Sequence, residues 1–223
     1  MYVPRPWTED GQRCASAGIP ADVGFATVPA PAAEMIAPHP GLRRPGALGG
    51  RRRGLRGNPT LRTELEQREV GYVLAVACDH RSPRSEERAA ALVTEMPRRA
   101  WQRLSAGTGA NGHRFYDRAV VYIADDRPGH NQVLVRRNRR TGELAFCRCY
   151  SSTAVPLSTL VGVVGRRWTV EETFQSGKGL TGLDEHQVRR WTSWHRWVTL
   201  AMLAHAFLAV ATADALTGTH QTD

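Results

Sequence analysis

The sequence predicts a mixed α/β protein, and three patterns of apolar residues support this fold class. Residues 72–78 form a continuous apolar run, which is typical of a buried strand of the parallel-sheet kind. A helix is expected just before it, because Leu61 and Leu65 recur at helical spacing. The third pattern is a set of three alternating segments joined by turn residues, which we expect to be strands: residues 114–123, 132–137 and 143–150.

Helices are expected in the last third of the chain. Residues 158–178 predict one helix, with Ser158 as its N-cap and Gly177 and Gly179 ending it. The remaining predicted helices are at residues 184–191 and 194–213, with a further one from Ser85 onward in the polar segment 79–100. The apolar stretch 198–213 is shorter than a membrane span and carries His205, so we expect it to be buried in the protein and expect no membrane partner.

Composition sets broad limits on function. The chain has 223 residues, 41% of them hydrophobic, and a formal net charge of +9, which would favour a polyanionic partner such as nucleic acid. Six of these net charges come from arginines within residues 38–57, a stretch without acidic residues, so the charge alone is poor evidence for DNA binding. The four cysteines are too few and too unevenly spaced for a disulfide framework or a well-supported zinc site.

The most specific motif lies in the segment Arg167-Trp168-Thr169-Val170-Glu171 and ends at Lys178. At about 100° per residue, Arg167, Glu171 and Lys178 fall within about 60° of one another on a helix. Such a face could hold a metal ion through Glu171 and bind DNA phosphates through its two cations. An ordinary salt-bridged helix is the alternative, since Arg and Glu four residues apart are common on exposed helices.

The spacing R-x3-E-x6-K, with Trp after the Arg, resembles the signature of insertion-sequence DDE transposases of the IS-four superfamily. Segments beginning at Gly71, Gly112, Leu134 and Leu183 resemble its IS-seven-hundred-and-one-like branch, and the resemblance covers residues 2–210 except 38–57. It implies an RNase H-like fold with an inserted β-rich module and C-terminal helices, in which two Asp and one Glu hold two Mg²⁺ or Mn²⁺ ions.

Carried over by position, the resemblance makes Glu171 the catalytic and metal-binding glutamate, and Arg167 and Lys178 DNA contacts. The superfamily's tyrosine three residues before the arginine is replaced by Val164, which removes a phosphate hydrogen-bond donor. The chain would correspond to the C-terminal part of such an enzyme, with the first catalytic Asp expected upstream of Met1.

The second catalytic Asp is expected before the helix at residues 60–68, where the arginine-rich stretch stands instead. Codons compatible with residues 48–56, read one base later, encode Trp-Val-Ala-Gly-Asp-Glu-Val-Tyr-Gly, which contains the expected motif. We therefore interpret this stretch as a possible frameshift and expect residues 38–57 to be irregular.

The predicted organisation has six segments. They are a partial N-terminal segment of the catalytic core (1–37), the arginine-rich stretch (38–59), a core helix and strand (60–78), the inserted β-rich module (79–157), the catalytic-glutamate helix with the C-terminal helices (158–213), and a tail (214–223).

Other candidate residues have competing interpretations. Asp125 and Asp126 precede a Pro-Gly pair and favour a solvated turn over a metal site. Three residues, His113, Tyr116 and Asp117, could contact DNA, although packing at a strand edge explains them equally well. Three tryptophans at helical spacing, Trp191, Trp194 and Trp197, favour packing in the core or between helices over base stacking, and His205 favours a satisfied core histidine.

These observations lead to two functional hypotheses. The first is a truncated DDE transposase fragment with an incomplete carboxylate set, so that enzyme activity is uncertain. The second is a non-catalytic DNA-binding or regulatory remnant that competes with intact transposase. Both predict a cytoplasmic, nucleoid-associated protein whose partners are transposon-end DNA and further copies of itself or of intact transposase.

Overall fold

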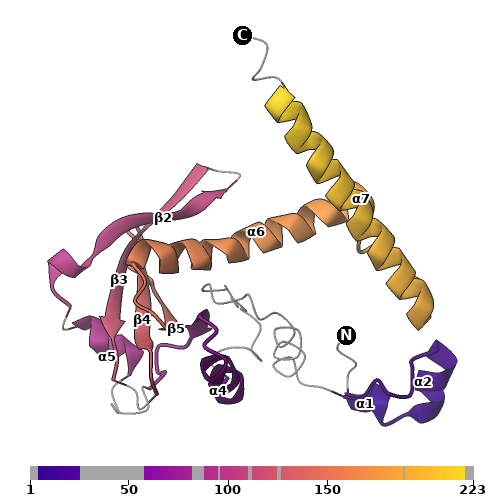
Figure 1. Ribbon diagram of the computed structural model, residues 1–223, viewed down its shortest axis with the longest axis horizontal. Coiled ribbons are helices and arrows are strands. Elements are labelled where there is room, and N and C mark those ends of the chain that lie inside the picture. Colours follow the sequence, from indigo (N-terminus) through magenta and orange to yellow (C-terminus); the bar gives the residue numbers. More distant parts are fainter. Residues whose placement is uncertain are drawn as a thin grey trace. The chain divides into compact units, whose positions relative to one another are not determined.

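The computed structural model describes residues 5–25, 58–81, 88–94, 96–109, 112–124, 127–187 and 189–218. The chain divides into two compact units, one formed by Thr27–Trp168 and the other by Met1–Ala26 with Thr169–Asp223 (Figure 1). The boundary falls within helix α6 (Leu157–Thr181), and this grouping differs from the six segments expected from the sequence. The arginine-rich stretch 38–57 and the pair Asp125-Asp126 lie outside the described residues.

The first unit is built on one antiparallel sheet with strand order β1-β5-β4-β3-β2. Its strands are β1 (Tyr72–Val76), β2 (Gln102–Gly109), β3 (Gly112–Tyr122), β4 (His130–Arg137) and β5 (Leu144–Ser151). The three strands expected after residue 113 are confirmed as β3, β4 and β5. Strand β1 belongs to the same sheet, so the sheet has no break at residue 78, where the inserted module was expected to begin.

The expected buried strand at residues 72–78 is confirmed as β1, but its parallel character is wrong. It pairs antiparallel with β5, with Tyr72 opposite Tyr150. The continuous apolar run predicted burial of both strand faces correctly, because Val73 packs against α6 while Tyr72 and Leu74 pack against the preceding helix. Coverage from both sides explains the composition without a parallel neighbour.

Helices cover both faces of this sheet. On one face the first half of α6 supplies Leu160, Val161 and Val163 to a core cluster that includes Val73. On the other face, α4 (Pro59–Gln67) packs Leu61 and Leu65 against β1 and β5, and α5 (Ala89–Thr94) covers β4 and β5. The short helix η1 (Arg98–Ala100) leads into β2. The predicted α/β class is confirmed as a mixed helix and sheet protein.

Two expected boundaries of α6 are wrong. The helix begins at Leu157, which places Ser158 inside its first turn rather than at its N-cap. It runs past Gly177 and Gly179 to Thr181, and Gly182 then takes a left-handed φ of 62°. Gly177 is buried within the helix in the second unit, where an added Cβ would make ordinary contacts with Leu183 at 3.6 Å and His205 at 3.8 Å, so it does not end the helix.

The second unit contains α1 (Arg5–Thr8), α2 (Gly11–Ala17), the end of α6, and α7 (Trp191–Gly218). The predicted helix at residues 184–191 is absent from the described residues of that segment, and α7 is one helix where a start at residue 194 was expected. The indole Nε1 of Trp197 donates a 3.0 Å hydrogen bond to the carbonyl oxygen of Gly182, and its ring stacks on His186.

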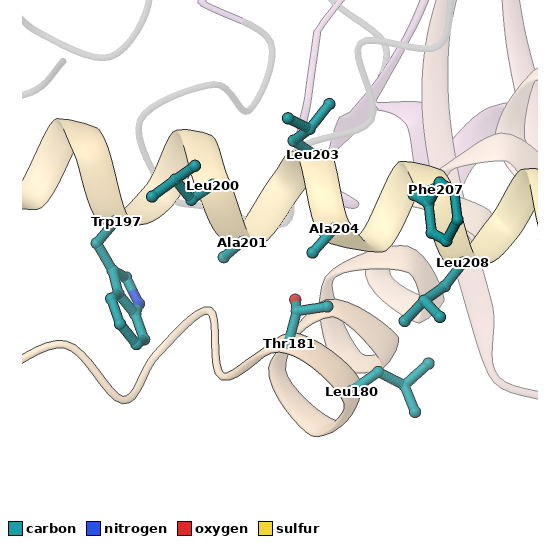
Figure 2. A pocket seen from close by; sticks show the side chains of 9 residues that line it. All are labelled: Leu180, Thr181, Trp197, Leu200, Ala201, Leu203, Ala204, Phe207 and Leu208. Carbon is teal, nitrogen blue, oxygen red and sulfur yellow. The ribbon is translucent and has the colours of Figure 1, made fainter.

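Burial of α7 was also expected, and this expectation is wrong. Among the described part of this helix Ala201 is the buried apolar residue, while its large apolar side chains are exposed: Trp194, Trp197, Leu200, Met202, Leu203, Phe207, Leu208 and Val210. Figure 2 shows Ala201, Ala204 and Leu208 facing the end of α6, with Leu203 directed away from it. The segment Trp191–Ala215 has a mean hydropathy of 1.6 and is, by length and composition, the one described helix that could cross a membrane.

Candidate nucleic-acid interface

Helix α6 carries all three residues of the motif. Glu171 and Lys178 lie on the part of α6 that belongs to the second unit, and both are exposed. Lys178 Nζ lies 3.4 Å from Asp184 Oδ2 in an ion pair whose side chains are 45% and 54% exposed. Such an exposed pair contributes little to stability, so it leaves Lys178 available to a competing anion.

Arg167 lies in the first unit, where it is half-buried beside the sheet. Val164, which occupies the position of the family's tyrosine, packs against the apolar cluster beneath α6. A side chain at this position therefore faces the sheet, and here the valine packs against the core.

Arg167 shares its surroundings with two arginines of the sheet, Arg118 on β3 and Arg136 on β4. The positive charges of Arg118, Arg136 and Arg167 each act to lower the pKa of the Cys147 thiol. Burial outweighs these charges and raises the pKa of Cys147 to about 11, so the thiol is neutral near pH 7. We call Arg118, Arg136 and Arg167 the arginine cluster.

Strand pairing forces two members of the arginine cluster together. Arg118 and Arg136 are directly opposite each other in the β3–β4 register, an arrangement that is unfavourable for like charges. Their guanidinium carbons lie 5.3 and 4.7 Å from the centre of the Tyr116 ring, so both also interact with its π face.

Arg118 is the most buried member, with 3% of its surface exposed. Burial and the charge of Arg136 lower the pKa of Arg118 to about 10, which leaves it charged at neutral pH. The Nε atoms of Arg118 and Arg136 are both buried without a hydrogen-bond partner among the described residues. Arg136 also lies 3.9 Å from the carboxylate of Glu143, a residue whose side chain is 66% exposed.

The arginine cluster could not be found from sequence spacing. Arg118 and Arg136 are 18 positions apart, and the cross-strand register brings them together. The turn at Gly142 indicates that β4 pairs with β5, but it does not indicate which strand pairs with β3. One feature of the sequence could have indicated the cluster: an unusual number of arginines lies on strands expected to be half-buried.

The other sequence candidates have structural roles in the described residues. Asp117 pairs with Arg137 at 2.9 Å and with Arg139 at 3.5 Å on the opposite sheet face, and the His113 ring packs against Phe115. Trp191 and Trp194 both contact the ring of His195, while His205 is half-buried near Gly177.

Potential metal ligands do not gather into a group among the described residues. Within them, no three side chains from His, Cys, Asp and Glu are gathered closely enough to hold an ion. The motif itself supplies one carboxylate, Glu171.

No protein-family model matches this chain, and no curated protein matches it significantly.

Proposed function

We propose that this protein is a DNA-binding fragment of a DDE transposase, an RNase H-like remnant that retains the motif helix but does not cleave DNA. The observation that supports this proposal most directly is that α6 is one uninterrupted helix carrying Arg167, Glu171 and Lys178 at their motif spacing. Glu171 and Lys178 are exposed on it, as residues that contact a ligand must be.

The proposed ligand is the DNA backbone. Arginine and lysine side chains near phosphates release condensed counterions, which makes binding weak at high salt and independent of sequence. The two cations of the motif can attract phosphate, while its one carboxylate cannot supply the ligands for two-metal chemistry. A regulatory role, in which the protein occupies transposon ends and excludes intact transposase, is compatible with the same chemistry.

DNA binding can be measured by fluorescence anisotropy with a labelled duplex across a range of salt concentrations. We expect affinity to fall steeply with salt, and Lys178→Gln to weaken binding and reduce the salt slope by about 0.9 for one lost phosphate contact. Arg5→Gln is a matched control. Like Lys178, Arg5 forms an exposed ion pair, in this case with Glu9, and it lies outside the motif. Absence of binding at 50 mM salt would refute the proposed function.

A further inference from the structure

We propose that a cavity between α2 and the start of α7 is a phosphate-binding site, with Arg190 and Arg196 as its charged ligands, and that its occupant is a phosphate of the nucleic-acid backbone. Both helices belong to the second unit. The choice of nucleic acid rests on the proposed function, whereas the site itself rests on the residues that line the cavity. All of these residues lie outside α6, so the cavity is distinct from the motif.

The cavity has a volume of about 640 Å³, which is within the range of small-ligand sites. Its lining residues are Ala15, Ser16, Ala17 and Gly18 at the end of α2, and Arg190, Thr192, Ser193 and Arg196 at the start of α7. Positions 192, 193 and 196 fall within about 100° of one another on a helix, so α7 presents Arg196 between two hydroxyl groups. Both arginines are exposed, so a ligand can reach them from solvent.

The two arginines of the cavity lack an internal counter-ion. Neither guanidinium group has a carboxylate partner in the part of the chain that the structure describes, and the lining includes no acidic side chain. Two acids of the same unit pair with other cations instead, Glu9 with Arg5 and Asp184 with Lys178. An anion that enters the cavity therefore meets two cations whose charges no described carboxylate neutralises.

The donors around the cavity match the oxygens of a phosphate. Each guanidinium group offers paired N–H donors in one plane, which can bind two phosphate oxygens at once. The hydroxyl groups of Thr192 and Ser193 supply two further donors, and neither is engaged by another described residue. This set of donors favours a tetrahedral oxyanion over a cation or an apolar ligand.

The end of α2 opposes anion binding, but by less than the arginines favour it. A helix C-terminus carries about half an elementary negative charge, compared with two full positive charges on the other side of the cavity. The carbonyl groups of Cys14 and Ala15 also already accept 3.0 Å hydrogen bonds from the backbone N–H groups of Ile19 and Gly18. The balance of charge in the cavity is therefore positive.

The test uses the full chain with Arg190→Gln and Arg196→Gln, since both side chains are exposed and their loss does not endanger folding. We expect each variant to weaken DNA binding about tenfold and to reduce the salt slope by about 0.9. Arg196→Lys should retain the salt slope, because the charge remains, yet bind more weakly because the paired donors are lost. The matched control is Arg189→Gln, because Arg189 is also exposed and adjoins Arg190 but does not line the cavity.

A second readout separates this site from DNA binding in general. Inorganic phosphate should raise the melting temperature of the wild type and of Arg189→Gln above that in sodium chloride of equal ionic strength, and Arg196→Gln should abolish the increase. Equal DNA binding by Arg196→Gln and Arg189→Gln, together with no phosphate-specific stabilisation, would overturn the site while leaving the proposed function standing.

Two further outcomes distinguish the source of the phosphate. Phosphate stabilisation that requires Arg196, combined with DNA binding that does not, would support the cavity as a site for free phosphate and overturn nucleic acid as its occupant. Phosphate stabilisation that requires Arg196 in a protein that binds no DNA would support the site and refute the proposed function.

Discussion

Gly165 of α6 lies so close to Ala106 of β2 that a Cβ on Gly165 would come within 1.8 Å of the Ala106 carbonyl oxygen. The contact occurs where β2 loses register with β3, between Ser105 and Thr108. The glycine thus lets the helix backbone approach an irregular strand directly, which places the first half of α6 on the sheet.

This contact predicts that Gly165→Ala destabilises the protein. The clash is with backbone rather than with a movable side chain, so we expect a loss of about 3 kcal/mol in the free energy of unfolding, at the upper end for overpacking. Gly162→Ala is the control on the same helix, because its added Cβ meets nothing within 4 Å. Chemical denaturation should show Gly162→Ala unchanged or stabilised by up to about 1 kcal/mol. Equal stability of both variants would contradict this packing.

A second prediction concerns the buried carboxylate of Glu66 on α4. It accepts a 2.5 Å hydrogen bond from the Tyr72 hydroxyl and forms an ion pair with Arg127. Tyr72→Phe leaves part of this buried acceptor capacity unsatisfied, and we expect a loss of about 1–3 kcal/mol in the free energy of unfolding.

The stacked neighbour Tyr150 provides the matched control for Tyr72→Phe. Its hydroxyl donates to the backbone oxygen of Glu66 at 3.5 Å, which is the limit of a hydrogen bond, so Tyr150→Phe should cost less. The same denaturation experiment compares the two variants, and a larger loss from Tyr150→Phe would show that ring packing, not the Glu66 contact, governs this corner.

Much of the sheet could be predicted from sequence because apolar periodicity indicates which residues are buried. The run at residues 72–78 predicted β1 and its burial, but periodicity contains no information on strand direction. Strand β2 was missed because Gly107, with a positive φ of 118°, and the bulge around it break the alternation. The exposure of α7 could not be predicted either. An apolar composition shows that a helix has an apolar surface, but it does not show what covers that surface.

The candidate site was predictable to the extent that it lies on one helix. Helical spacing related Arg167, Glu171 and Lys178 directly, and α6 is continuous through all three. The partners of Arg167 on the sheet depend on tertiary register, and no local pattern contains that information.

A third prediction is a pH dependence of stability arising from His80. Burial lowers the pKa of His80, and the charges of Arg62 and Arg148 lower it further, while Asp79 partly opposes them. As pH falls, the unfolded chain takes up this proton near its ordinary pKa of about 6.5 before the folded chain does. Stability is therefore unaffected by His80 above that pH and decreases below it.

Thermal melts of the wild type and His80→Gln between pH 5 and pH 7.5 measure this effect. On acidification, the melting temperature of the variant should fall less than that of the wild type, because glutamine does not titrate. His195 is an exposed histidine, and His195→Gln controls for removal of an ionisable ring outside this environment. Parallel pH profiles for the wild type and His80→Gln would exclude His80 as the titrating group.

The last prediction is that purified protein does not nick or join DNA in Mg²⁺ or Mn²⁺. Two-metal phosphoryl transfer requires ions about 3.5–4 Å apart, each held by carboxylates while it stabilises the attacking or leaving oxygen. One glutamate, Glu171, cannot hold both ions, and the described residues gather no further group of ligands. Glu171→Ala should therefore change DNA binding little, and slightly in favour of binding, because a negative charge is removed beside phosphate. A gel assay on labelled transposon-end duplexes, with and without chelator, compares wild type and Glu171→Ala. Metal-dependent cleavage by the wild type that Glu171→Ala abolishes would show that further carboxylates complete a working active site, and that the protein is an enzyme.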